Sequence, residues 1–379
     1  MREALINGRI VSQGQVLDDR ALVIEDGWIA DIVSGEDAGR EAAPLHDLKG
    51  AWLLPGFIDT QVNGGGGVLF NDDPSVETIR TIGAAHRKFG TTGFLPTLIS
   101  DDLGKVKRAI EAVAAATEEG VPGVLGIHIE GPFLSPARKG VHDEAQFRTL
   151  DDEAVALLGS LKTAKTLVTL APEMTTPDMI ARLTGAGVIV AAGHTNATYD
   201  VMQKALAHGV TGFTHLFNAM SPLTAREPGV VGAALSEAAS YCGIIVDGRH
   251  VHPDVLKLAL KLKAHDRFML VTDAWSNVGT GLTSFQLQGA TIMVKDGVCM
   301  NENGTLAGSA MDMSRAVRNA MTMLGRDLHE AVTMASRAPA SFLGLSDRYG
   351  EIAKGMRASL VAADDALNVC ATWIDGVRA

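Results

Sequence analysis

The sequence contains few cysteines and fewer basic than acidic residues. Its three cysteines, Cys242, Cys299 and Cys370, are isolated and form no CxxC pair. We therefore expect neither a disulfide framework nor a cysteine-based zinc site. The cysteine content fits a reducing compartment. Lysine and arginine total 33 against 44 acidic residues, giving a net charge of -11. Because an acidic surface repels phosphate backbones and anionic lipids, we expect neither nucleic acid nor a membrane as a partner, although a local cationic pocket can still bind a phosphorylated molecule.

Long apolar runs are also missing. No segment approaches the ~20 apolar residues that span a bilayer, and the first ten residues lack the basic and then apolar pattern of a signal peptide. We therefore expect a cytoplasmic protein. Its 379 residues are 46% hydrophobic, which is enough for a sizeable core in one large domain with an accessory module, or in two domains.

Both ends of the chain contain short segments typical of β-strands, separated by turn residues such as Asp26-Gly27. The expected strands cover residues 4–10, 21–25, 28–32, 359–363 and 368–373. They predict a small β-sandwich domain formed by both termini, residues 1–51 and 346–379, beside a central domain of residues 52–345.

The central region alternates short apolar runs with longer segments of helical periodicity, the pattern of repeated βα units. Eight runs cover residues 56–60, 94–99, 124–130, 166–171, 188–194, 212–217, 241–247 and 268–273. Helices are expected at 76–89, 103–119, 199–208 and 253–262 and, after an irregular stretch, near 311–324 and 328–337. Eight units predict an α/β fold, the (β/α)8 TIM barrel. The rival fold, an open doubly wound sheet, is disfavoured because no GxGxxG opens a helix.

Four chemically capable side chains fall at predicted strand ends, where (β/α)8 enzymes gather their active sites. Glu130 ends the third run, His194 the fifth and Asp273 the eighth, and His215 lies in the sixth. Two histidines and a glutamate form a known catalytic zinc set that leaves a position for water. The metal lowers the pKa of that water toward about 7. Asp273 is then placed to take the proton and pass it to a leaving nitrogen.

Other histidines fit structural roles better. His208 and His265 fall in expected helix or loop surface, and His252 is expected to start a helix. His128 lies two residues before Glu130, so both side chains point to the same side of the strand. We expect His128 to fill an interior layer of the barrel, with a second metal ligand as the alternative.

Longer motifs surround these positions. They are LPGFID at 54–59, GIHIEGPF at 126–133, AGHT at 192–195, THLFNAM at 214–220, DGRH at 247–250, VTDA at 271–274 and LAGS at 306–309. With them the sequence resembles the amidohydrolase superfamily, and specifically the N-acetylglucosamine-6-phosphate deacetylases, over nearly its whole length. The HLFNAM and EGP runs together carry the more specific part of this resemblance.

The resemblance implies an activity and a set of roles. The activity is hydrolysis of the acetamido bond of N-acetylglucosamine 6-phosphate to glucosamine 6-phosphate and acetate, by a homodimer or homotetramer. Asp273 is implied as general base and then acid, and His142 as a group that helps polarise the acetyl carbonyl. The implied metal ligands are Glu130, His194 and His215. Contacts to the sugar or phosphate are implied for Asn218 and Ala219, and for Arg226 and His250, either of which a neighbouring subunit can contribute. A cover over the substrate is implied for Leu306, Ala307 and Gly308.

One departure from the wider superfamily bears on the metal count. Many members carry two histidines spaced by one residue on the first strand, where this chain has Gln61 and Asn63. Because amides are poor zinc ligands, we expect one divalent metal ion per chain, with zinc as the expected ion, and hydrogen bonding by both amides. Three alternatives remain open: deacetylation of the N-acetylgalactosamine 6-phosphate isomer, another amidohydrolase reaction, and a catalytically inactive scaffold. The scaffold is disfavoured because all four strand-end residues are present.

Overall fold

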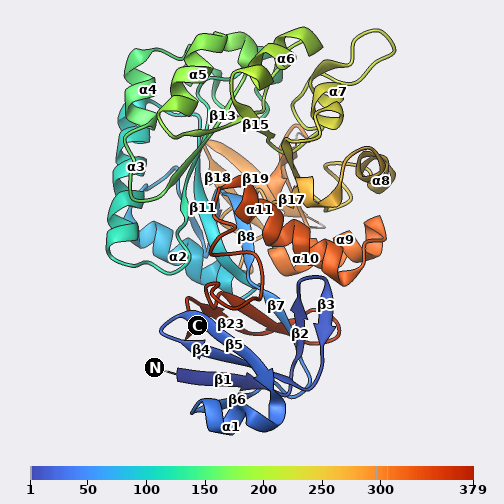
Figure 1. Ribbon diagram of the computed structural model, residues 1–379. Coiled ribbons are helices and arrows are strands. Elements are labelled where there is room, and N and C mark those ends of the chain that lie inside the picture. The colour runs from blue at the N-terminus through green and yellow to red at the C-terminus, as the bar shows by residue number, and fades with distance from the viewer. Residues whose placement is uncertain (1, 296, 305) are drawn as a thin grey trace.

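The computed structural model describes residues 2–295, 297–304 and 306–379. A larger body of alternating strands and helices stands on a smaller lobe made almost entirely of strands (Figure 1). Both chain termini lie in this small lobe, where blue N-terminal strands and red C-terminal strands meet.

Eight parallel strands form the larger body, and neighbouring strands follow the order of the chain. They are β8 (Phe57–Val62), β11 (Thr91–Ile99), β12 (Gly126–Glu130), β13 (Lys165–Leu170), β14 (Ile189–Ala192), β15 (Val210–Phe213), β16 (Tyr241–Ile244) and β17 (Phe268–Leu270). The sheet closes just beyond β17, where the backbone N–H of Asp273 donates to the carbonyl of Gln61 over 3.0 Å and that of Asn63 donates to Ala274 over 2.9 Å. Each predicted run overlaps one of these strands, so the predicted (β/α)8 barrel is confirmed.

Helices pack around the outside of the barrel, and polar side chains mark where several of them begin. Ser75, Asp102 and Thr198 each accept a hydrogen bond from the backbone of the first helical turn, which satisfies an N–H group that has no partner within the helix. The helices are α2 (Val76–Arg87), α3 (Leu103–Glu118), α4 (Asp152–Leu158), α5 (Pro177–Gly185), α6 (Tyr199–Ala207), α7 (Gly229–Ser236), α8 (Pro253–Leu262), α9 (Met313–Leu324), α10 (Leu328–Ala335) and α11 (Arg337–Phe342).

The small lobe consists of two sheets with a shared apolar core. One has the order β5-β4-β1-β6 and the other β24-β23-β22-β7-β2-β3, so strands from both termini pair within the second. Leu22 of the first sheet and Trp373 of the second lie in the same buried cluster. The predicted strand at 4–10 is two strands, because Asn7 adopts a φ of 56° between them. The strands are β1 (Arg2–Ile6), β2 (Arg9–Ser12), β3 (Gln15–Leu17), β4 (Arg20–Glu25), β5 (Trp28–Ser34), β6 (Leu45–Asp47), β7 (Trp52–Pro55), β22 (Leu360–Ala363), β23 (Val369–Ile374) and β24 (Val377–Arg378), with the short helix α1 (Ala38–Glu41) before β6.

The stretch after the eighth barrel strand, expected to be irregular, contains a four-stranded antiparallel sheet. Its strands are β18 (Ser284–Leu287), β19 (Ala290–Lys295), β20 (Val298–Asn301) and β21 (Leu306–Ser309). One face is anchored by Trp275, which stacks on Phe285 with the ring centroids 5.9 Å apart. This sheet brings β21, and with it Gly308, to the mouth of the barrel.

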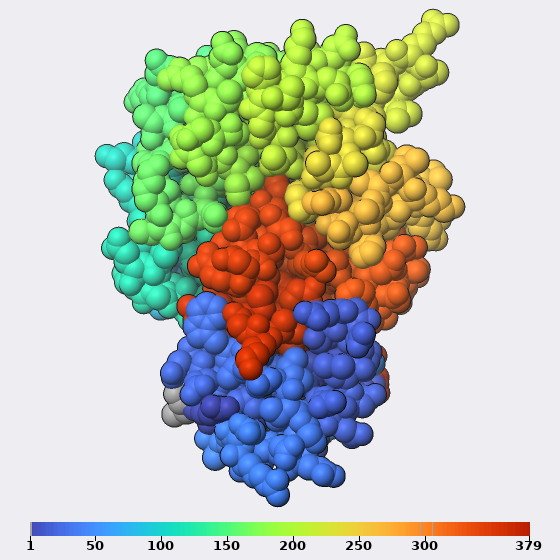
Figure 2. All heavy atoms as spheres, in the orientation of Figure 1, coloured from blue at the N-terminus to red at the C-terminus, as the bar shows by residue number. Residues whose placement is uncertain are grey.

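None of the described helices is both long and apolar enough to cross a membrane. The segment just before α7 projects from the surface of the large body, at the upper right of Figure 2.

Candidate active site

The four predicted strand-end residues meet at one mouth of the barrel, and three of them have an unusual backbone. His194, His215 and Asp273 have φ angles of 48°, 33° and 49°. Residues other than glycine rarely adopt this left-handed backbone conformation. It costs of order 1–3 kcal/mol per residue and is found mainly at functional sites. This conformation also ends the strands earlier than predicted, since β14, β15 and β17 stop two or three residues before these side chains.

Glu130, His194 and His215 form a buried cluster whose ligand atoms all lie within 4.8 Å of one another. The Nε2 atom of His215 lies 3.1 Å from Oε1 of Glu130 and 3.0 Å from Nε2 of His194. The Nε2 atom of His194 lies 3.3 Å from the same carboxylate oxygen. One carboxylate and two imidazoles at such spacing are the donor set of a catalytic zinc site.

The hydrogen bonding of His194 tests whether this cluster suits a cation. Its Nδ1 atom lies 2.8 Å from the backbone carbonyl of Arg138, which can only accept, so Nδ1 carries the proton. In the neutral ring, Nε2 then points an unprotonated lone pair toward the Glu130 carboxylate. Two lone pairs facing each other repel unless a cation lies between them, and this carbonyl contact is the usual way that a protein orients a metal-binding histidine. The three residues therefore fit a divalent metal ion.

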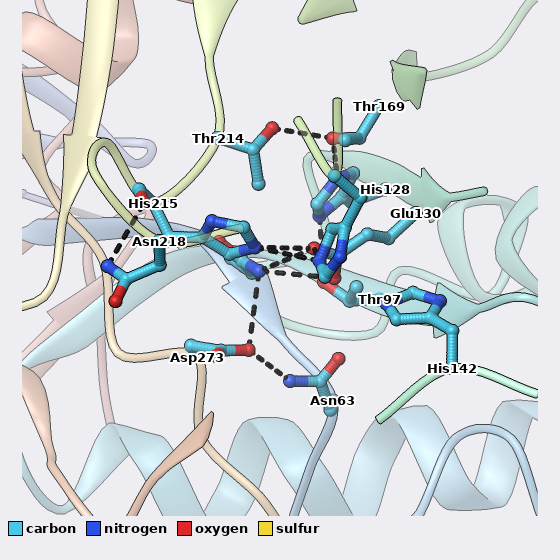
Figure 3. A network of polar contacts seen from close by, with 12 residues as sticks. Asn63, Thr97, His128, Glu130, His142, Thr169, Thr214, His215, Asn218 and Asp273 are labelled. Atoms are coloured by element: carbon cyan, nitrogen blue, oxygen red, sulfur yellow. Dashed lines mark hydrogen bonds and ion pairs between the residues drawn. The ribbon is translucent and has the colours of Figure 1, made fainter. Parts of the chain in front are cut away.

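Asp273 lies beside the cluster and is held by two amides (Figure 3). Its Oδ1 accepts from Nδ2 of Asn63 over 2.7 Å and from Nε2 of Gln61 over 3.3 Å. Gln61 also donates to both Glu130 oxygens, over 3.1 and 3.2 Å. Burial, joined by the nearby Glu130 carboxylate, raises the pKa of Asp273 to about 6. A carboxyl group with such a pKa suits proton transfer in both directions near neutral pH.

His142 belongs to the same site, although it comes from a loop after β12. Its side chain is 4% exposed, and its ring centroid lies 4.4 Å from that of His194. Its Nδ1 atom contacts both the hydroxyl and the backbone N–H of Ser100, at 2.8 and 3.3 Å. The ring is thereby fixed at the edge of the metal cluster.

These groups line a cavity of about 630 Å³. Among the predicted site residues, the cavity wall includes the following: Glu130, His142, His194, His215, Asn218, Ala219, His250, Asp273, Leu306 and Gly308. Ala307 is fully buried within β21. Arg226 is exposed in the projecting segment before α7 and does not line this cavity. Arg138, Lys139 and Trp275, which no sequence pattern indicated as site residues, line the cavity as well.

Two further lining residues are oriented by local hydrogen bonds. His250 contacts Oδ2 of Asp247 through Nδ1 at 2.6 Å. Although burial opposes ionisation of Asp247, the hydrogen bond from His250 holds the pKa of that carboxyl below its usual range. Asn218 donates through Nδ2 to the backbone carbonyl of His215 over 3.1 Å, which turns its amide oxygen away from that carbonyl.

His128 fills an interior layer of the barrel. Its ring is 1% exposed, with Nδ1 3.2 Å from the hydroxyl of Thr97 and Nε2 2.8 Å from that of Thr169. Because both nitrogens already have partners and burial lowers the pKa of His128 to about 4, this ring is a neutral structural group. Among the described residues it does not join the Glu130–His194–His215 cluster.

A (β/α)8 barrel with this cluster at its mouth defines a metal-dependent hydrolase. The chain belongs to the amidohydrolase family, whose sequence model matches residues 52–378. It is 44% identical to the N-acetylgalactosamine-6-phosphate deacetylase of Shewanella sp. strain ANA-3, over 97% of this chain and 93% of that protein. It is 38% identical to the N-acetylglucosamine-6-phosphate deacetylase of Haemophilus influenzae, over 99% of each. The crystal structure of N-acetylglucosamine-6-phosphate deacetylase from Pasteurella multocida has a TM-score of 0.96 to this chain at 39% identity and covers 100% of both.

Proposed function

We propose that this chain hydrolyses the acetamido bond of N-acetylglucosamine 6-phosphate, releasing acetate and glucosamine 6-phosphate. The observation that carries this proposal is the buried cluster of Glu130, His194 and His215 with Asp273 beside it in one cavity. The full-length similarity to amino-sugar 6-phosphate deacetylases supports the choice of substrate.

Glu130, His194 and His215 would hold one divalent ion, and zinc suits this mixture of nitrogen and oxygen donors. When bound, the ion supplies Lewis-acid activation of water and of the amide carbonyl. Gln61 and Asn63 direct N–H donors at the carboxylates of Glu130 and Asp273. An N–H group cannot donate and bind a metal from the same atom, so these contacts favour a single ion.

Asp273 is the proposed general base and then acid. Its Oδ1 is occupied by the amides of Asn63 and Gln61, which leaves Oδ2 to accept a proton from the attacking water. The water oxygen bonds to the acetyl carbon, the carbon–nitrogen bond breaks, and the same proton passes to the leaving nitrogen. Across the cavity, His142 is the proposed donor to the carbonyl oxygen as negative charge develops there.

Recognition of the sugar phosphate is assigned to the wider cavity. Asn218 and Ala219 contact the sugar or phosphate, His250 meets a sugar hydroxyl or the phosphate, and the segment Leu306 to Gly308 covers the substrate. Arg226 reaches the phosphate from a neighbouring subunit, since in its own chain this side chain lies outside the cavity. A guanidinium suits this task because it binds phosphate oxygens bidentately and stays charged.

The galactosamine isomer is a second candidate substrate. The relative from Shewanella, an N-acetylgalactosamine-6-phosphate deacetylase, is 44% identical to this chain, against 38% for the Haemophilus enzyme. The two substrates differ at one sugar hydroxyl, remote from the acetamido bond, so the same catalytic residues serve both.

Acetate release from four sugars tests the proposal. The substrates are N-acetylglucosamine and N-acetylgalactosamine, each with and without the 6-phosphate, and Asp273→Asn is the control protein. We expect the highest kcat/KM for N-acetylglucosamine 6-phosphate and little turnover of the unphosphorylated sugars. A higher kcat/KM for N-acetylgalactosamine 6-phosphate favours the second candidate, and turnover of none of the four would refute deacetylation.

We further propose that this enzyme is a cytoplasmic homodimer or homotetramer without nucleic-acid or membrane partners. The net charge of -11 supports the absence of polyanionic partners. The proposed small domain consists of residues 1–51 and 346–379, and strand β7 (Trp52–Pro55) pairs with its strands; the remainder of residues 52–345 forms the catalytic domain.

A further inference from the structure

Ser100 and His142 form a buried contact at the edge of the cavity. Ser100 directly follows β11 and is 1% exposed. Its hydroxyl lies 2.8 Å from Nδ1 of His142, and its backbone N–H donates to the same nitrogen over 3.3 Å. Two groups of one residue therefore converge on one ring nitrogen.

This contact determines which nitrogen of His142 carries the proton. A backbone N–H can only donate, so Nδ1 must be the acceptor and is unprotonated. A neutral imidazole with a bare Nδ1 carries its hydrogen on Nε2.

The surroundings keep the hydroxyl in place. A Cβ atom at Gly131 would lie 2.2 Å from Oγ of Ser100, so only glycine there leaves room for this hydroxyl. A flipped His142 ring would turn a C–H group toward both Ser100 donors and leave them without an acceptor. The ring orientation and the hydrogen position are thus set together.

We propose that Ser100 is a positioning residue that holds His142 in its Nε2–H form, so that Nε2 can donate a hydrogen bond to the carbonyl oxygen of the scissile amide. This inference rests on the proposed deacetylase function. Ser100 does not touch the substrate and acts only through His142.

A double-mutant cycle separates this role from a general structural one. Ser100→Ala keeps the backbone N–H and loses the hydroxyl, so we expect kcat to fall about fivefold to tenfold, the effect of about one hydrogen bond, with KM nearly unchanged. His142→Ala removes the donor itself and should lower kcat by about 10²-fold or more. Adding Ser100→Ala to His142→Ala should change kcat by less than about twofold, because the residue through which Ser100 acts is gone.

An electron-poor substrate gives a readout that a structural role would not move. In the N-trifluoroacetyl analogue of the sugar phosphate, fluorine withdraws electrons and the carbonyl needs less help from a donor. The loss caused by Ser100→Ala should shrink to within about twofold on this analogue, as expected for a donor to the developing oxyanion. Ser276→Ala is the matched control, because Ser276 is a buried serine whose hydroxyl has no partner among the described residues.

The outcomes are distinct. The role of Ser100 is overturned if Ser100→Ala lowers kcat equally for the acetyl and trifluoroacetyl substrates. It is also overturned if the effects of Ser100→Ala and His142→Ala on kcat are independent in the double variant. In both cases the deacetylase function stands. A wild-type chain that turns over no amino-sugar 6-phosphate removes the proposed function and this inference together. If Ser100→Ala does not fold, Ser100→Gly removes the same hydroxyl with the same expectations.

Discussion

Nδ2 of Asn63 donates to Oδ1 of Asp273 over 2.7 Å, across the seam where the first and last strands of the barrel meet (Figure 3). The first strand has Gln61 and Asn63 where the superfamily pattern described above would place two histidines. Here the amide binds the proposed catalytic acid instead. In the proposed single-metal mechanism, this strand position therefore supports proton transfer.

Removing the Asn63 amide is therefore expected to affect catalysis more than binding. Asn63→Ala should lower kcat about tenfold, since hydrogen bonds to charged groups contribute about 1.5–3 kcal/mol and Gln61 still donates to Asp273. Steady-state kinetics and elemental analysis check this, with KM and metal content expected near wild type. The kcat of Asp273→Asn, whose amide cannot accept the proton, should fall by about 10²–10⁴-fold. A wild-type kcat in Asn63→Ala would show that the contact has no catalytic role.

Arg226 is expected to discriminate between phosphorylated and unphosphorylated sugars. Arg226→Ala should lower kcat/KM for the phosphorylated sugar roughly tenfold or more, the value of a charge-assisted hydrogen bond, and hardly change it for the unphosphorylated one. Arg108→Ala, which removes an exposed arginine from α3, is the control for loss of surface charge. Equal losses of Arg226→Ala on both sugars would mean that the side chain supports loop order and not phosphate binding.

Asp59, inside the barrel wall, is expected to make stability depend on pH. Burial raises the pKa of this carboxyl to about 7, although Thr272 donates to it over 2.5 Å. The folded state therefore keeps a proton that the unfolded chain loses above its ordinary pKa of 3.8. The stabilising contribution is complete below about pH 4 and disappears as the pH rises through about 7.

Comparison with Asp59→Asn isolates this effect. The side chain of the variant cannot titrate. The free energy of unfolding of the variant, relative to that of wild type, should therefore rise by about 2 kcal/mol between pH 5 and pH 7. Denaturant unfolding at both pH values measures the difference. If the free energies of unfolding of the two proteins change with pH in the same way, protonation of Asp59 does not contribute to stability.

The sequence predicts the barrel and its mouth because the positions of strands follow from the local pattern, although three of the strands end two or three residues earlier than predicted. The apolar runs locate all eight strands, and Glu130, His194, His215 and Asp273 follow from the rule that barrel enzymes place catalytic groups at strand ends. The β18–β21 sheet escapes prediction because three of its strands have only four residues, too few for an apolar alternation to stand out.

Contacts between loops that are distant in the sequence could not be predicted from local patterns. Ser100 and His142 are 42 positions apart, and neither lies in a periodic segment that would fix its direction. The resemblance supplies a role for His142, but only the fold brings Ser100 to its ring. Arg138 and Lys139 likewise enter the cavity wall through the course of a loop, which hydrophobic periodicity does not specify.

The central claim is catalysis by one metal ion held by Glu130, His194 and His215, and a titration of activity with metal tests it most directly. Protein freed of metal by a chelator is supplied with increasing zinc while acetate release from N-acetylglucosamine 6-phosphate is measured, with His194→Ala as the control. Activity should be nearly absent without metal, rise in proportion to zinc and level off at one equivalent per chain, and His194→Ala should stay inactive. Full activity in the metal-free protein, or a rise that continues to two equivalents, would contradict the account.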